Sequence, residues 1–303
     1  MNTLTLLGRN VSDATVETFF QDHLGHLPDW EDLELDADNY YSEEIDIPSL
    51  GLEVSVFNEN RFRAQDPDTW DDSTGIIGAL YFSQDAATTF TPPLAVTWQD
   101  TLPDAQQRLQ QQSLDYCVFD NVLVVRQADC HTTFVFKQQV LDEVRIELKP
   151  VLLPTVSDFR VPDLAQLQAA LGLPLEQMQD HAAWADVFEL CEDDDDDRVS
   201  DGAIDLSDLC GLKISLEDGI IIGYKFYNDR EQDAVRWAGE LPANLKWADC
   251  PHCPKDMKIV KQRDDEFDGY MLGTYFKHDI HLYYNKLHGT FARITYGIED
   301  FLC

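Results

Sequence analysis

The chain has 303 residues, of which 44% are hydrophobic and 11% aromatic, so it can bury a sizeable core without disulfides or metal ions. It carries 57 acidic and 22 basic side chains, and the resulting net charge of -35 repels nucleic-acid backbones and anionic lipid headgroups. Nucleic-acid binding is therefore not expected, whereas a basic protein partner is favoured, because the same field attracts cationic proteins.

The start of the chain and its cysteines indicate an intracellular protein. The opening MNTLTLLGRN lacks a basic segment followed by an apolar one, and no stretch approaches the roughly 18 apolar residues of a membrane helix. The cysteines are odd in number and scattered, which is typical of free thiols in a reducing cytosol. We expect a cytoplasmic protein without membrane contact. Acidity that serves only solubility, or that reflects a salt-rich host, is the alternative to a basic partner.

The two halves of the chain resemble each other in the same order, which indicates internal duplication. The last matching stretch pairs Trp98 with Trp247 and Asp100 with Asp249. In chain order, the matches are 11–28 with 161–174, 45–56 with 204–216, 75–83 with 219–228, and 92–100 with 241–249.

Each half is predicted to contain a helix, an acidic loop, two strands, a third strand with the tryptophan, a second helix and a meander of about three strands. The opening helices end at Leu-Gly with a nearby proline, which is a normal helix stop. The second helix of the first half spans 100–112, with Asp100 or Thr101 as its N-cap, and its counterpart spans 249–261. The closing meanders alternate apolar and polar residues, as antiparallel strands with one wet face do, and cover 121–148 and 271–298.

This order of elements predicts an α+β fold of two tandem copies of a helix-plus-antiparallel-sheet unit from internal duplication. The first repeat spans 1–150 and the second 151–303, with a boundary in the proline-rich stretch 149–162. We expect 11–148 and 161–299 to superpose. Two separate domains and one body with pseudo-twofold symmetry are both compatible with the sequence.

Two acidic stretches, 29–46 and 192–208, are the candidate partner-binding surfaces, and they occupy equivalent places between the first helix and the first strand of each repeat. The first contains no basic residue and places aromatic side chains among its carboxylates. Aromatic side chains supply buried anchors in interfaces while the flanking charges steer association, although these aromatics could instead pack on their own sheet. The candidate residues are Asp29, Trp30, Glu31, Asp32, Glu34, Asp36, Asp38, Tyr40, Tyr41, Asp193, Asp194, Asp195, Asp196, Asp197 and Asp201.

The CPHC sequence at 250–253 suggests thiol or metal chemistry. It resembles the active-site loop of thioredoxin-fold oxidoreductases, but no proline follows Pro254 to supply the facing cis-proline loop, and the other repeat has the cysteine-free TLPD there. Zinc would need two further ligands, since structural zinc sites have four N or S donors. Folding could recruit them only from Cys191, Cys210, His252 and His278. No cofactor or metal site is predicted, and Cys250 and Cys253 are the metal-ligand candidates.

A calcium loop is a second interpretation of 192–208, because clustered carboxylates suit hard cations. With Gly202 at the required glycine, Val199 falls where an oxygen ligand belongs. The ligands would be Asp197, Asp201, Asp205 and Asp208. A solvated, flexible acidic loop is therefore predicted. The sequence contains no nucleophile elbow, phosphate-binding glycine loop or metalloprotease helix, so no catalytic residue is predicted.

The duplicated pattern of a proline, a strand with a tryptophan, an acidic turn and a short helix, as in PPLAVTWQDTLPDAQQRL, resembles immunity proteins of bacterial polymorphic-toxin systems, whether contact-dependent or type VI. Through the repeat, the resemblance covers most of the chain. It implies a non-enzymatic, cytoplasmic inhibitor that binds and neutralises a basic cognate toxin such as a nuclease. The alternative is a thiol- or metal-dependent module that uses the CPHC and poly-Asp segments.

Overall fold

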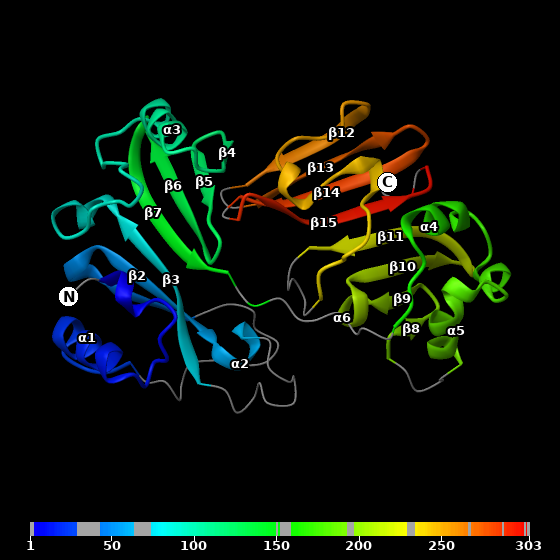
Figure 1. The fold of residues 1–303 in the computed structure, drawn as a ribbon, viewed down its shortest axis with the longest axis horizontal. Coiled ribbons are helices and arrows are strands. Elements are labelled where there is room, and N and C mark those ends of the chain that lie inside the picture. The colour runs from blue at the N-terminus through cyan, green and yellow to red at the C-terminus, as the bar shows by residue number, and fades with distance from the viewer. Residues whose placement is uncertain are drawn as a thin grey trace. The chain divides into compact units, whose positions relative to one another are not determined.

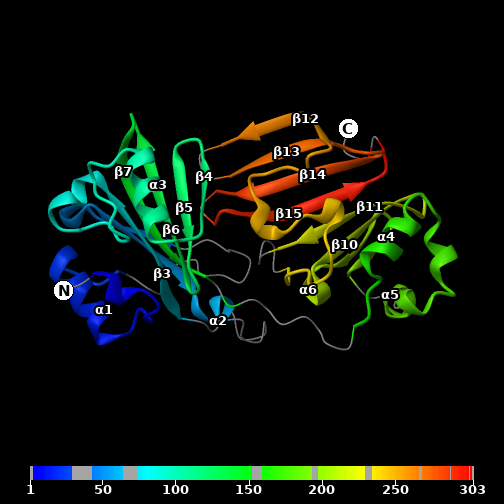
Figure 2. The same cartoon turned by 45° about the horizontal axis from the view of Figure 1, so that its top comes forward.

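The computed structural model describes residues 3–28, 43–63, 74–149, 151, 159–192, 197–228, 234–265, 268–286, 288–299 and 301. The chain divides into two compact units, Met1–Val151 with Leu287–Gly289, and Leu152–Lys286 with Thr290–Cys303. Each unit contains one antiparallel sheet with helices beside it, as Figures 1 and 2 show. The fold is therefore α+β, as predicted, and it is richer in sheet than the sequence indicated.

The first unit has a seven-stranded sheet in the order β1-β2-β3-β7-β6-β5-β4, in which all neighbouring strands are antiparallel. Its strands are β1 (Glu43–Ile47), β2 (Leu52–Asn58), β3 (Gly75–Ser83), β4 (Tyr116–Phe119), β5 (Val122–Arg126), β6 (Cys130–Lys137) and β7 (Val140–Leu148). The described α-helices are α1 (Ala14–Leu24), α2 (Glu59–Phe62) and α3 (Leu102–Gln111).

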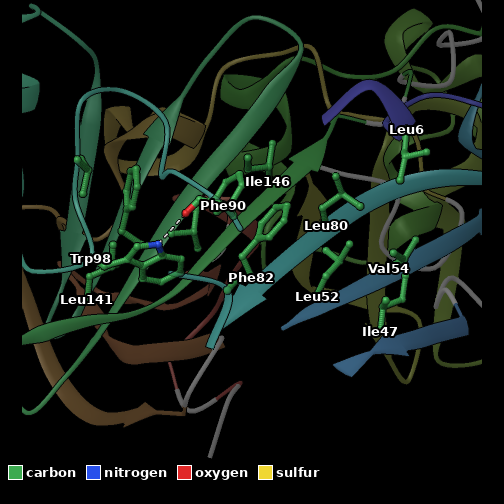
Figure 3. Close-up of a cluster of buried hydrophobic side chains, with 14 of the residues drawn as sticks. Leu6, Ile47, Leu52, Val54, Leu80, Phe82, Phe90, Trp98, Leu141 and Ile146 are labelled. Atoms are coloured by element: carbon green, nitrogen blue, oxygen red, sulfur yellow. Dashed lines mark hydrogen bonds between the residues drawn. The ribbon is translucent and has the colours of Figure 1, made fainter. Parts of the chain in front are cut away.

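One face of this sheet carries the core of the first unit (Figure 3). Apolar side chains alternate along the strands, so Leu52, Val54 and Ile47 lie together on the buried face with Val16 of α1. The loop after β3 adds an aromatic cluster, in which Phe82 and Phe90 stack with ring centroids 3.6 Å apart. The indole Nε1 of Trp98 donates to the Phe90 carbonyl at 3.0 Å, so this buried polar group is satisfied.

The ends of the predicted helices have identifiable caps. Asp13 caps α1 by accepting a hydrogen bond from the Thr15 amide, and α1 ends before Gly25, whose φ of 79° few other residues adopt. Thr101 and Asp104 form a reciprocal capping box at the start of α3, so Thr101 is the N-cap. These boundaries confirm the opening helix and the second helix predicted for the first half.

The second unit has an eight-stranded sheet in the order β12-β13-β14-β15-β11-β10-β9-β8, and its neighbouring strands are also antiparallel. Its strands are β8 (Val199–Ser200), β9 (Ala203–Leu206), β10 (Leu212–Glu217), β11 (Ile220–Tyr227), β12 (Met257–Asp264), β13 (Asp268–Tyr275), β14 (His278–Asn285) and β15 (Thr290–Gly297). The described α-helices are α4 (Leu164–Ala170), α5 (Ala185–Cys191) and α6 (Ser207–Cys210).

The second core is built against α4, the helix predicted at 161–174. Tyr224 of β11 is fully buried and donates its hydroxyl to the carbonyl of Leu167 in α4 at 2.8 Å. Burial raises the pKa of this phenol, so it stays protonated and continues to donate. A capping box between Asp163 and Gln166 fixes the start of the helix.

Several predicted elements are wrong in detail. Trp98 lies in a loop and Trp247 in a 3-10 turn (Trp247–Asp249), so neither half has a third strand bearing the tryptophan. The second helix expected at 249–261 is absent from the described residues, because Met257 onward joins β12. The predicted meanders at 121–148 and 271–298 do contain three strands each, β5 to β7 and β13 to β15, but β4 and β12 precede them as further strands that the sequence did not predict. Apolar residues at mixed spacing made these segments ambiguous between helix and strand.

A half-buried histidine in the second sheet lies in an environment that disfavours its charged form. His281 of β14 packs edge-on against Tyr270, and its Nε2 is buried without a hydrogen-bond partner among the described residues. Burial, aided by the positive charges of Arg293 and Lys225, lowers the pKa of His281 to about 4. The imidazole is therefore neutral in the folded protein at neutral pH.

We expect His281→Gln to reduce the acid sensitivity of the fold. As the pH falls from about 6.5 to about 4, the unfolded chain takes up the proton before the folded one, so His281 costs the wild type about 2 kcal/mol of stability over this window. Urea unfolding of both proteins as a function of pH measures the difference. Parallel stability curves for the two proteins over this window would show that His281 does not titrate in this way.

Candidate partner interface

Most of the predicted interface residues lie outside the described part of the chain. These are Asp29, Trp30, Glu31, Asp32, Glu34, Asp36, Asp38, Tyr40 and Tyr41 of the first acidic stretch, and Asp193, Asp194, Asp195 and Asp196 of the second. The structure describes the C-terminal ends of both stretches, and each end belongs to a sheet. The prediction of loops up to 46 and through 192–208 is therefore wrong for these ends.

The end of the first acidic stretch is β1, a strand at the edge of the first sheet. Ile45 and Ile47 turn toward the core, whereas Glu44 and Asp46 alternate with them and are exposed. Asp46 lies directly opposite Glu53 of β2 in the antiparallel register. Carboxylates therefore face each other across the two strands, an arrangement that costs stability because like charges repel.

The charge state of Glu53 reports this repulsion. Its pKa is raised above the ordinary value by partial burial and by the negative charges of Glu44 and Asp46. Arg145 of β7 opposes the shift, but its guanidinium also forms an ion pair with Glu143. The carboxylates of Glu44, Asp46 and Glu53, which we call the β1 carboxylate group, therefore lack a full counter-charge among the described residues.

The second unit has a neutralised version of the same cross-strand position. Asp205 of β9 lies opposite Lys213 of β10, and the Lys213 ammonium is 2.8 Å from the carboxylate. Although burial acts in the other direction, hydrogen bonds from Lys213 and Ser207 hold the pKa of Asp205 below its usual range. In the second unit a lysine thus neutralises the aspartate across the strands, whereas in the first unit two carboxylates face each other.

The end of the second acidic stretch is the hairpin of β8 and β9. Asp197 and Asp201 are exposed on it, so these two predicted interface residues are accessible. Arg198 makes a forked ion pair with Asp208, with the shortest distance 2.8 Å, which ties the hairpin to α6. Asp205 and Asp208, two of the four carboxylates considered for calcium, are therefore ion-paired to cationic side chains.

The CPHC segment lies in a turn before β12. Cys250 is buried, Cys253 is half-buried, and Cys253 lines a hollow of about 360 Å³ with His252. Burial raises the pKa of Cys210 to about 12, so this candidate zinc ligand is a protonated thiol that donates to the Leu206 carbonyl. Within the described ranges, no group of three or more His, Cys, Asp or Glu residues is placed to hold a metal ion.

Glu44 and Asp46 lie within the predicted stretch 29–46, although they were not among the candidate residues, and Glu53 lies outside that stretch. The signal for Glu53 was present in the alignment of 45–56 with 204–216, which places Glu53 where the second repeat has Lys213. The two aligned positions carry opposite charges, and each lies opposite an aspartate, Asp46 in one unit and Asp205 in the other.

Comparison with known proteins adds little to this picture. No family model matches the chain, and no curated protein matches it. Among solved structures there is a match to the Bacillus megaterium YpeB C-terminal domain, with 11% sequence identity, a TM-score of 0.14, and coverage of 66% of this chain and 99% of that one. None of the described helices is both long and apolar enough to cross a membrane.

Proposed function

We propose that this chain is a non-enzymatic acidic inhibitor that binds and neutralises a basic protein in the cytoplasm, as immunity proteins bind their cognate toxins. The observation that carries the proposal is the pair of opposed carboxylates, Asp46 and Glu53, with Glu44 beside them. A basic protein such as a nuclease would supply the missing lysine or arginine charge.

The energetics favour a partner at this place. Leaving carboxylates unpaired costs the free protein stability, and a partner that brings cations relieves the repulsion on binding. The net charge of -35 draws such a partner in over a longer range. Local repulsion and the overall field therefore favour the same kind of ligand.

We also propose that the two units are copies of one ancestral unit. The order of the first sheet, starting at β1, matches the order of the second sheet, starting at β9. The second sheet has one additional strand, β8. The tryptophan segments share details that the alignment did not require. Leu94 and Ala95, like Ala243 and Asn244, have positive φ angles. The backbone amides of Thr97 and Lys246 donate to Asp100 and Asp249, each at 2.8 Å.

Affinity capture from the native host tests the proposed function. The bait is the wild-type chain, compared with a neutralised variant carrying Glu44→Gln, Asp46→Asn and Glu53→Gln. A matched control, Asp85→Asn, Glu217→Gln and Asp218→Asn, removes the same charge from exposed positions elsewhere. We expect the wild type and the control to retain one basic protein, encoded beside this gene, that the neutralised variant loses.

The captured protein is then expressed alone and together with this chain. We expect it to arrest growth alone and to be harmless with the wild-type inhibitor. A retained protein that is acidic, or a toxin that the neutralised variant still captures and inhibits fully, would contradict the proposed function or its location.

A further inference from the structure

The second sheet has β8 at one edge and β12 at the other, and the β12 edge is basic although the chain as a whole is strongly acidic. Strand β12 is the edge strand of its sheet (Figures 1 and 2) and carries Lys258, Lys261 and Arg263 with one acidic residue, Asp264. Arg263 forms an exposed ion pair with Asp265 at 2.9 Å, so Lys258 and Lys261 are the main source of the strand's positive charge. Every residue from 258 to 264 is exposed. Among them are two large apolar side chains, Ile259 at 45% and Val260 at 75%. A single strand thus combines positive charge with exposed apolar surface.

The backbone of β12 is available for further pairing. The strand bonds to β13 on one side, with a bulge at Val260, and runs regularly from Lys261 to Asp264 beyond the bulge. No backbone hydrogen bond joins residues 258–264 to any other described segment. An edge strand of this kind presents unpaired N–H and C=O groups that another strand can bind.

Strand β1 has the complementary properties at the edge of the first sheet. Its described neighbour is β2 alone, and no other described backbone group bonds to residues 43–47. Glu44 and Asp46 project from it, exposed to solvent. Its length of five residues is close to the regular part of β12.

We propose that β1 of one copy of this chain pairs with β12 of a second copy, so that the two molecules associate through complementary sheet edges. Carboxylates of Glu44 and Asp46 then lie among Lys258, Lys261 and Arg263, while the contact covers Ile259 and Val260. Charges on edge strands determine which edges can pair, because an edge repels another edge of the same charge and attracts one of opposite charge. Pairs of two β1 edges or of two β12 edges are thereby disfavoured.

The contact is heterologous, since the two surfaces differ. Repeated contacts of this kind generate either a closed ring or an open chain of molecules. In either case the β1 carboxylate group is covered. A basic partner would then compete with the second copy for the β1 carboxylate group. Self-association would therefore keep the inhibitor inactive until its target displaces the second copy.

Sedimentation velocity of the purified chain tests the pairing without any partner protein. We expect concentration-dependent association at physiological salt, because the mutual repulsion of two chains of net charge -35 is screened beyond about 8 Å there, whereas opposite charges in direct contact still attract. Lys258→Glu with Lys261→Glu and Arg263→Glu should give a monomer, and so should Glu44→Lys with Asp46→Lys. Mixing these two variants restores opposite charges at both contacts and should restore the complex. The matched control Asp85→Asn, Glu217→Gln, Asp218→Asn should associate like the wild type.

Hydrogen exchange of the wild type at low and high protein concentration gives a test that needs no variant. We expect slower exchange at high concentration in peptides covering β1 and in those covering β12. A wild type that stays monomeric at physiological salt, or association that both charge-reversed variants retain, would overturn the pairing. Since no partner is present, either result would leave the proposed inhibition of a basic protein standing.

Discussion

Replacing Gly211 with alanine is expected to cost the second unit about 3 kcal/mol or more of its free energy of unfolding. The residue has a φ of +75°, and a Cβ there would lie 2.3 Å from the Val235 carbonyl oxygen and 2.5 Å from the Trp237 amide nitrogen. Both contacts are with backbone. That backbone is held in place, since Val235 donates to Ser207 and Trp237 to Tyr227, each at 2.8 Å.

Gly172→Ala is the matched control for this substitution. Gly172 has nearly the same φ, +77°, but no atom lies within 4 Å of its added Cβ. Alanine there should cost only the left-handed backbone strain, about 1 kcal/mol. Denaturant unfolding of the two variants separates the cost of backbone strain from the cost of the steric clash at the added Cβ. Equal losses would show that the segment at 235–237 moves aside.

Glu53→Lys is expected to strengthen the fold and to weaken partner binding. The new ammonium faces Asp46 as Lys213 faces Asp205, so a repulsive cross-strand pair becomes an attractive one. We expect a gain of about 0.5–1 kcal/mol in unfolding free energy. The association rate with a basic partner should fall by about tenfold at low salt, because the substitution puts a positive charge in the β1 carboxylate group.

The reciprocal substitution, Lys213→Glu, gives the control in the second unit. It opposes two carboxylates there, so it should lower stability while leaving the association rate unchanged. Thermal unfolding and stopped-flow association with the captured partner provide both readouts. If Glu53→Lys were to lose stability and bind normally, the β1 carboxylate group would be neither strained nor part of the interface.

The sequence predicted those elements whose signals are local. Asp13 and Asp163 precede apolar periodic stretches and cap α1 and α4, as helix-start signals require. The alignment of 45–56 with 204–216 also matched equivalent strands, since Ile45 pairs with Val54 as Ile204 pairs with Ile214. When two short strands are joined by a tight turn at a glycine, the turn and the apolar pattern of the strands themselves set their register.

The remaining features depend on contacts distant in sequence. The segment MKIVK reads equally well as a helix or a strand, and only its pairing with β13 places it at a sheet edge. Trp98 lies in a loop because its indole binds the Phe90 carbonyl, which no periodicity reveals. The pairing of Asp46 with Glu53 was not predicted for the same reason, since it depends on the register of β1 and β2.

The rate of association with the captured basic partner, measured across a range of salt concentrations, tests the proposed inhibition most directly. The wild type and the Asp85→Asn, Glu217→Gln, Asp218→Asn control should associate with a steep, equal dependence on salt. Glu44→Gln, Asp46→Asn, Glu53→Gln should associate more slowly and with a flatter dependence, although its total charge equals that of the control. Identical rates and salt dependences for the two variants would contradict the account, because only the overall charge, and not the β1 carboxylate group, would then guide the partner.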